Sequence, residues 1–176
     1  HILNLSLMTN KFPSKWKIAK IVPLYKGKGC KLDPKNYRPV AILPILSKVL
    51  ERAMFLQMVN YMDSNNFFNS NHHAYRSFHS TTTTMLQMYT TWLEAIEQGD
   101  LAAVCMIDMS AAFDVVDTEL LLDKIKLYGF DRNAIQWTWS YLTYRSQSVY
   151  IEGSLSSPLS LEAGVPQGSI LGPLLY

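Results

Sequence analysis

The segment VCMIDMSAAFDVVD, residues 104–117, constrains the fold of this chain more than any other part of the sequence. An uncharged apolar run, residues 101–107, leads directly into Asp108, and Asp114 and Asp117 follow closely. The run predicts a buried central strand. A carboxylate at the end of such a strand is costly unless a partner compensates its desolvation, and a metal ion commonly does so. A strand end followed by a helix-capping turn explains Asp117 well and Asp108 poorly, so Asp108 is the candidate metal ligand.

Charge is distributed unevenly along the chain. Residues 1–38 contain nine Lys or Arg and one acid, giving +8, and the remaining seven basic and thirteen acidic residues give −6, which together make the net +2. Such a division suits a polyanion bound by one part and a cation bound by the other. A solvated lysine-rich face explains the basic part equally well.

The size and the cysteines indicate an intracellular globular protein. With 176 residues and 48% hydrophobic content, the chain can bury the core of one domain or part of one. Cys30 and Cys105 lie far apart and predict a reducing compartment without disulfides, and Cys105 is expected to be a small core residue. We expect neither a signal peptide nor a membrane span. The chain begins with His1 and ends in an apolar run, and we expect it to be a fragment.

Hydrophobic periodicity predicts an α+β fold with helices on one side of a small sheet. Strands are expected at 20–25, 39–43, 101–107, 147–152 and 157–163, and helices at 45–62, 81–98, 118–128, from 132 and after 169. Ser80, Asp117 and Asp131 are the expected N-caps, and Gly129 is the expected residue after a helix C-terminus.

Three familiar kinds of site are not favoured. The sequence KGKG at 26–29 lacks the spacing of a Walker loop, although its lysines could contact a triphosphate and a plain turn is the alternative. Ser169 is not in a G-x-S-x-G elbow. His72, His73 and His79 have no cysteine nearby, which favours loop histidines over a zinc site.

Five segments in order carry a family resemblance: WKIAKIVPLYKGKG, NYRPVAILPILSKVLER, HHAYRSFHSTTTTML, MIDMSAAFDVVD and AGVPQGSILGPLLY. From about residue 10 to residue 176 the chain resembles the reverse transcriptase domain of non-LTR (LINE-type) retrotransposons. The resemblance implies a right-hand polymerase fold, with a fingers portion at 1–98 and an incomplete palm at 99–176 whose antiparallel sheet is backed by helices. It also implies RNA-directed DNA polymerisation in the cytoplasm and nucleus, with an RNA template, a DNA primer, deoxynucleoside triphosphates and two Mg²⁺ ions.

By this resemblance, Asp108 and the backbone carbonyl of Met109 bind Mg²⁺. Phe113 matches the aromatic residue under the sugar of the incoming nucleotide, where it favours deoxynucleotides, with core packing as the alternative role. Gln167 and Gly168 match the element that lines the nucleotide and template pocket.

The resemblance also assigns cationic side chains. Arg38 matches the fingers arginine over the incoming nucleotide, where its planar guanidinium can stack and pair with phosphate. Lys26 or Lys28 is the accompanying triphosphate contact, and the spacing does not choose between them. Arg76 matches a template-contacting residue, with an ion pair as the alternative.

The chain also departs from the family pattern. Ala74 and Phe78 stand where the family often has glycine, so side chains could strain a tight backbone there. The Tyr-x-Asp-Asp motif, with two of three metal-binding carboxylates, is not in the sequence, and we expect the isolated fragment to be inactive. The alternatives are a non-catalytic nucleic-acid-binding module, a decayed element remnant, and a group II intron-type or telomerase-like polymerase.

Overall fold

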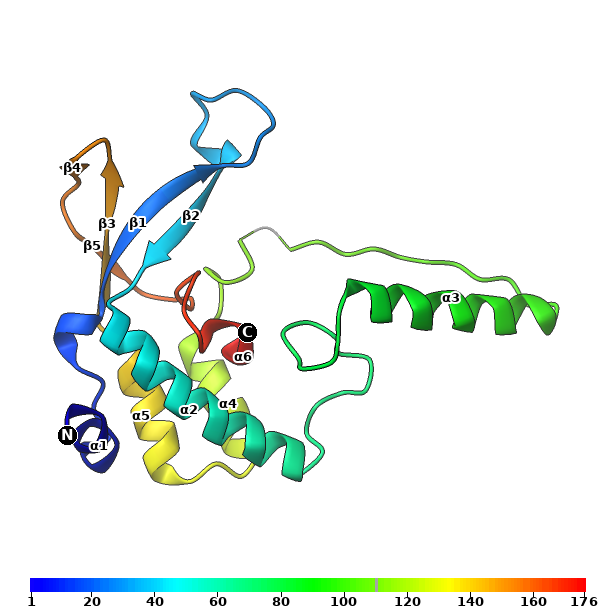
Figure 1. The fold of residues 1–176 in the computed structure, drawn as a ribbon, viewed down its shortest axis with the longest axis horizontal. Coiled ribbons are helices and arrows are strands. Elements are labelled where there is room, and N and C mark those ends of the chain that lie inside the picture. The colour runs from blue at the N-terminus through cyan, green and yellow to red at the C-terminus, as the bar shows by residue number, and fades with distance from the viewer. Residues whose placement is uncertain (110) are drawn as a thin grey trace. The chain divides into compact units, whose positions relative to one another are not determined.

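The computed structural model describes residues 1–109 and 111–176. The chain divides into two compact units, one formed by His1–Gln57 with Ala111–Tyr176 and the other by Met58–Ser110. The first unit contains a sheet backed by helices (Figure 1), which confirms the α+β expectation. The division of the chain into fingers and palm at residue 98 is a functional assignment and stays a prediction.

The sheet of the first unit has five strands and is mixed (Figure 1). β1 (Ile18–Tyr25) and β2 (Tyr37–Ile42) form an antiparallel hairpin. β3 (Arg145–Ile151) pairs with β1 in parallel, with Ile18 opposite Ser146. The sheet expected from the sequence is antiparallel, so this pairing differs from the expectation. The short strands β4 (Ser154–Leu155) and β5 (Leu159–Leu161) pair with β3 in antiparallel fashion.

Two prolines face each other in the hairpin. Pro23 of β1 lies opposite Pro39 of β2. A proline cannot donate to a ladder, so it is tolerated only where no neighbouring strand needs its N–H. β2 is an edge strand, and β3 pairs with β1 only over residues 18–21, so neither proline interrupts the pairing with β3.

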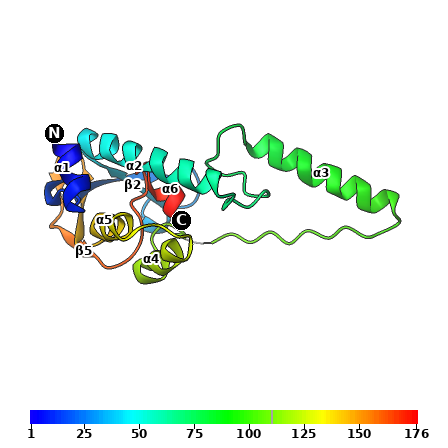
Figure 2. The same ribbon diagram turned by 90° about the horizontal axis from the view of Figure 1, so that it is seen from below.

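The α-helices of the first unit gather at the end of the sheet opposite the tip of the β1–β2 hairpin (Figures 1 and 2). They comprise α1 (Ile2–Thr9), the start of α2 (Ile45–Ser64), α4 (Thr118–Leu127), α5 (Arg132–Leu142) and α6 (Gly172–Leu175), with the 3-10 turn η1 (Ser14–Trp16) after α1. A second 3-10 turn, η2 (Pro34–Asn36), lies at the tip of the hairpin, directly before β2. The predicted caps are confirmed: Leu120 N–H donates to Asp117 at 2.9 Å and Ala134 N–H donates to Asp131 at 2.7 Å. Among the described helices, none combines the length and the hydropathy that a membrane span requires.

Aromatic side chains fill the space between α1 and α5. Phe12 meets Trp16, Trp137 and Tyr141 edge to face, with ring centroids 6.0, 5.7 and 5.0 Å away. Trp137 Nε1 donates to Ser6 Oγ at 3.1 Å, which satisfies the indole N–H inside the core. This cluster fixes α5, and β3 follows α5 directly.

The second unit contains α3 (Thr81–Glu97), which begins at a capping box formed by Ser80 and Thr83, as the sequence predicts for Ser80. The expected strand at 101–107 is wrong, because residues 101–109 form no helix or strand. Leu101, Met106 and Ile107 are 100%, 84% and 86% exposed, and Cys105 is exposed as well, so it is no core residue. An apolar run favours burial but does not supply the neighbouring strand that a ladder needs.

Candidate functional site

The loop between β5 and α6, residues 164–169, is hydrogen-bonded to two separated segments of the first unit. Its start donates two backbone hydrogen bonds, from Gly164 N–H to the Val116 carbonyl at 2.8 Å and from Val165 N–H to the Phe113 carbonyl at 2.7 Å. Further along, the Gln167 carbonyl accepts a hydrogen bond from Ala41 N–H at 2.8 Å. The loop therefore holds the turn that contains Phe113 and the strand β2 in one place.

Gly168 approaches β2 so closely that no other residue fits. Its φ is +108°, and a Cβ atom there would lie 2.9 Å from the Ala41 carbonyl oxygen and 3.8 Å from Val40 Cγ1. Only glycine tolerates both this conformation and this contact. Side chains alternate along a strand, so Val40 and Arg38 share one face of β2. Gly168 thus lies beside Val40, which is on the same face of β2 as Arg38.

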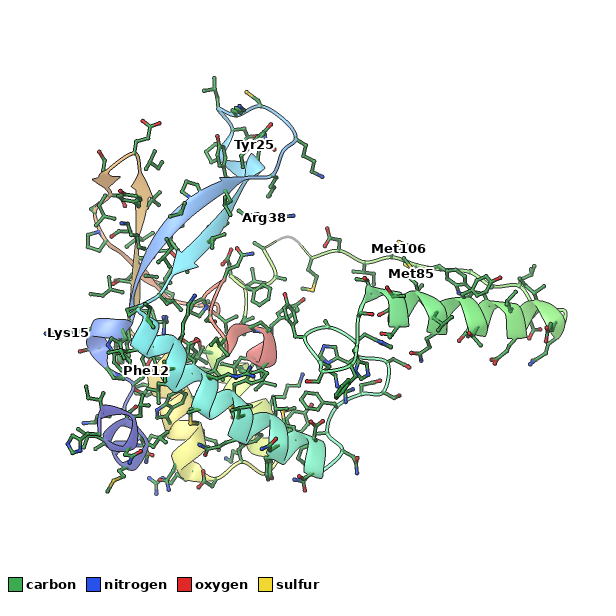
Figure 3. All side chains as sticks on the ribbon, viewed as in Figure 1. Phe12, Lys15, Tyr25, Arg38, Met85 and Met106 are labelled. Atoms are coloured by element: carbon green, nitrogen blue, oxygen red, sulfur yellow. The ribbon has the colours of Figure 1, made fainter. Side chains whose placement is uncertain are left out.

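Arg38 is an exposed residue of β2 and lies opposite Leu24 of β1. Figure 3 shows its side chain pointing away from the neighbouring strands, with Tyr25 nearer the tip of the hairpin. Within residues 1–109 and 111–176, no hydrogen bond or ion pair of its guanidinium is recorded. The predicted phosphate-binding group is therefore accessible.

Phe113 is half-buried in a turn closed by the hydrogen bond from Asp114 N–H to the Ala111 carbonyl at 2.8 Å. Its ring stacks on Tyr176, with centroids 5.1 Å apart and planes inclined by 30°. The predicted packing role is thus present, and the role of Phe113 beneath a sugar stays a prediction.

The two candidate lysines lie at the tip of the hairpin and differ in their contacts. Lys26 Nζ donates to the Lys35 carbonyl at 2.7 Å, and its backbone N–H donates to the Asn36 carbonyl at 2.8 Å. Lys28 is exposed, and the described part of the chain provides no recorded partner for its ammonium group. Of the two, Lys28 has the group that a phosphate could engage without breaking a contact.

A pocket of about 280 Å³ lies on the other face of the hairpin, since its lining includes Pro39 and Ala41, which alternate with Arg38 and Val40. Polar groups also line it, namely Asp114, Arg145, Gln147 and Gln167. Partial burial raises the pKa of Asp114 above its ordinary value. The predicted residue Gln167 therefore belongs to a pocket that Arg38 does not line.

Asp108 and Met109 belong to the second unit, whereas Arg38, Phe113, Gln167 and Gly168 belong to the first. Both are exposed. In the described ranges, no group of three or more His, Cys, Asp or Glu side chains is placed to hold a metal ion. The histidines of the second unit are instead engaged with neighbours, as His73 bonds Thr83 and Gln87 at 3.0 and 2.7 Å.

Arg76, the predicted template contact, is held within the second unit. Its guanidinium lies 3.8 Å from Asp63 Oδ1 and 5.0 Å from the ring centroid of Phe68, and it donates to the His72 carbonyl at 3.4 Å. The ion pair expected as the alternative is therefore present. A role toward a template stays a prediction.

Sequence reasoning missed a group of buried polar residues behind the loop, namely Ser47, Glu51, Tyr141 and Arg145. A signal for Glu51 exists in the sequence. Ser47, Glu51, Met54 and Met58 follow helical spacing and form one stripe of α2, and all four are buried. The phase of the apolar pattern thus places a carboxyl group in the core.

Comparisons with known proteins identify a family and several relatives of this chain. The family described as reverse transcriptase (RNA-dependent DNA polymerase) matches residues 26–176. The chain is 34% identical to the probable RNA-directed DNA polymerase from transposon BS and 33% identical to the polymerase from mobile element jockey, both of Drosophila melanogaster. It is 30% identical to the probable polymerase from transposon X-element of the same organism. Each alignment covers 99% of this chain and 19% of the relative, so the chain spans about a fifth of the length of these curated relatives.

Proposed function

The chain belongs to the reverse transcriptase (RNA-dependent DNA polymerase) family, and from this premise we propose that it forms the nucleotide-binding part of a non-LTR retrotransposon polymerase. The proposed reaction is attack of a primer 3′-hydroxyl on the α-phosphate of a deoxynucleoside triphosphate, directed by an RNA template. The relatives are named as RNA-directed DNA polymerases, and each is much longer than the aligned segment.

One observation carries the proposal. The loop at 164–169 bonds both to β2, through Ala41 and Gln167, and to the turn that contains Phe113. Residues that are far apart in the sequence and that the family resemblance assigns to nucleotide binding thus lie on one bonded framework. A site that binds a nucleotide with fixed geometry needs such a rigid support.

The proposed roles follow from side-chain chemistry. Arg38 pairs with the triphosphate through its guanidinium, and Lys28 adds a second positive charge. Phe113 supports the sugar and leaves no room for a 2′-hydroxyl. Gln167 and Gly168 line the space for the base pair between nucleotide and template, and Arg76 contacts the template.

Magnesium is the proposed cofactor. The exposed Asp108 carboxylate and the Met109 carbonyl are hard oxygen donors of the kind Mg²⁺ prefers, and Mg²⁺ sites in polymerases use few carboxylates together with substrate phosphates. This donor set fits part of a magnesium shell. When bound, the ions would neutralise the charge that develops on the phosphoryl group.

The polymerase assay requires the flanking segments of a relative. We suggest a chimera in which this chain replaces the aligned segment of the jockey polymerase, assayed for primer extension on an RNA template. Asp108→Asn should abolish extension, because it removes the carboxylate that binds the metal. Arg38→Ala should raise the KM for deoxynucleotides roughly tenfold, since about 1.4 kcal/mol of charge-assisted binding is lost.

Arg132→Ala is the matched control, because Arg132 is an exposed arginine of the same unit outside the loop framework. Full extension by the Asp108→Asn chimera would remove Asp108 from the metal site. A wild-type chimera that binds RNA but does not extend primers would favour the non-catalytic nucleic-acid-binding alternative.

A further inference from the structure

Glu51 is a fully buried acid with three hydrogen-bond donors around it. Its relative exposure is 0%, and so is that of Ser47, one turn earlier in α2. Ser47 Oγ donates to Glu51 Oε1 at 2.7 Å, and the backbone N–H of Ile170 donates to Oε2 at 2.8 Å. The N–H of Leu171 also points to Oε2, at 3.4 Å. A buried carboxyl group is tolerated only with such partners.

The backbone donors belong to the turn that follows the nucleotide loop. Ile170 comes three residues after Gln167 and two after Gly168. At the start of α6, the Gly172 N–H donates to Ser169 Oγ at 2.9 Å, and this local contact leaves the N–H groups of Ile170 and Leu171 to find other acceptors. N–H groups at the start of a helix have no partner within the helix, and if buried they must find one elsewhere. Glu51 supplies that partner from α2, far away in the sequence.

The loop is therefore held at three places. Backbone atoms make the first two, at Gly164 and Val165 and at Gln167. Only the third, at Ile170 and Leu171, depends on a side chain from another element. Since Gly168 lies between the second and third places, loss of the third would leave the loop after Gln167 held on one side only.

A second charge accompanies Glu51 in the core. Arg145 is 2% exposed, and its Nη1 donates to the Tyr141 carbonyl at 2.8 Å. Burial lowers the pKa of Arg145, while Tyr141 and Glu51 act in the opposite direction. Burial raises the pKa of Tyr141, and the charge of Glu51 adds to this effect. Opposite charges thus share one buried region, where either charge alone would be costly.

We propose that Glu51 is a positioning residue for nucleotide binding: it holds the start of α6 and thereby fixes Gln167 and Gly168 against β2. The proposal rests on the proposed function, because it names a further residue of the same site. Glu51 itself touches no nucleotide and acts through the loop.

The test uses the ¹⁵N-labelled 176-residue chain and two NMR measurements. The first is hydrogen exchange at the Ile170 and Leu171 amides, which reports whether the loop is held and needs no ligand. The second is the Kd of dATP with Mg²⁺, followed by the shift of the Gly168 amide signal.

Two substitutions at Glu51 separate hydrogen bonding from packing. Glu51→Gln keeps an oxygen that accepts from Ile170 and an amide that can donate to Ser47. It also removes the negative charge near Arg145, so its Tm should fall, but well below that Tm the exchange and the Kd should stay within about threefold of the wild type. Glu51→Leu keeps the volume but leaves both N–H groups unpaired. We expect faster exchange at both amides and a Kd raised at least roughly tenfold, a factor that corresponds to about 1.4 kcal/mol.

Two controls exclude a general loss of stability. Ser47→Ala removes the donor to the other oxygen of Glu51 and leaves the loop contacts in place. Leu50→Ala opens a cavity at a neighbouring residue that is 0% exposed and should lower the Tm by several degrees. Below their Tm, both variants should bind dATP like the wild type.

Each result is decisive. Faster exchange in Glu51→Leu with an unchanged Kd would overturn the proposal, because the held loop would not matter for the nucleotide. A raised Kd in Leu50→Ala equal to that in Glu51→Leu would overturn it too, since stability alone would explain both. If the wild-type chain shows no shift with dATP, the proposed nucleotide site fails and the positioning role fails with it, whereas the exchange data still show whether Glu51 holds the loop.

Discussion

At the scale of single residues, Phe78 shows what a departure from glycine does to the backbone. Its φ is +63° and its side chain is fully exposed, at 101%. An L-residue in this left-handed conformation is strained, and no burial of the ring offsets the strain. The sequence resemblance places glycine here, so the structure gives a physical reason for that preference. Ala74, the other departure, does not have a positive φ.

Phe78→Gly should stabilise the protein. The left-handed conformation costs an L-residue roughly 1 kcal/mol, and part of the gain is offset by the greater backbone entropy of glycine in the unfolded chain, so we expect about 0.5 kcal/mol. Denaturant unfolding measures the change. Ser77→Gly is the control, since Ser77 does not have a positive φ and should lose stability instead.

Lys17 is a second residue with an unusual environment. It is 8% exposed, and its Nζ lies 5.9 Å from the ring centroid of Tyr144. Burial lowers the pKa of Lys17, and the positive charge of Arg145 adds to this effect. The folded state therefore binds the lysine proton less tightly than the unfolded state does.

This shift makes stability depend on pH in a defined direction. At neutral pH both states are protonated, and the folded state carries the full penalty of the buried cation. As the pH rises through the lowered pKa towards about 10.5, the folded state loses its proton first and the penalty disappears. Lys17→Met should thus exceed the wild type in unfolding free energy near neutral pH, by a margin that shrinks in alkaline solution.

Thermal unfolding between about pH 7 and pH 10 would measure this margin. Lys15→Met is the control, because Lys15 is exposed and its replacement should give a difference that does not vary with pH. A constant margin for Lys17→Met would contradict the assigned environment.

At the scale of elements, local signals determine where helices begin. Ser80, Asp117 and Asp131 each accept a hydrogen bond from the backbone N–H three residues later, as the sequence predicts. The donor and the acceptor are three residues apart, so nothing outside the turn decides the geometry. The start of α6 also has a local acceptor, because the Gly172 N–H donates to Ser169 Oγ. The N–H groups of Ile170 and Leu171 just before α6 are bound instead by Glu51 of α2, a partner that no local pattern reveals.

The cap of α5 can be tested directly. Asp131→Ala should cost about 1 kcal/mol, because Ala134 N–H loses its side-chain acceptor. Urea unfolding measures this. Asp123→Ala changes an exposed acid within α4 and should alter the free energy by less than about 0.5 kcal/mol. Equal losses in the two variants would argue against the capping role.

At the scale of the whole molecule, the two units should differ in local stability. β1 pairs with a strand on each side over residues 20 and 21, whereas residues 101–109 form no helix or strand and are exposed. Amides in a ladder exchange only when the ladder opens, so β1 should exchange near the rate of global unfolding and residues 101–109 fastest. Hydrogen exchange followed by NMR measures both, and strong protection at 101–109 would contradict the structure.

The sequence by itself determined the starts of α2, α3, α4 and α5, the presence of strands at β1 and β2, and the family. These depend on contacts between near neighbours or on residues kept in a fixed order. Tertiary structure alone decided that β1 and β3 pair in parallel, that Glu51 holds the loop of Gln167, and that residues 101–107 form no strand. The physical reason is common to all three. A strand ladder or a buried hydrogen bond needs a partner from elsewhere in the chain. An apolar or acidic residue in the sequence indicates that such a partner is needed, but it does not indicate which residue that partner is.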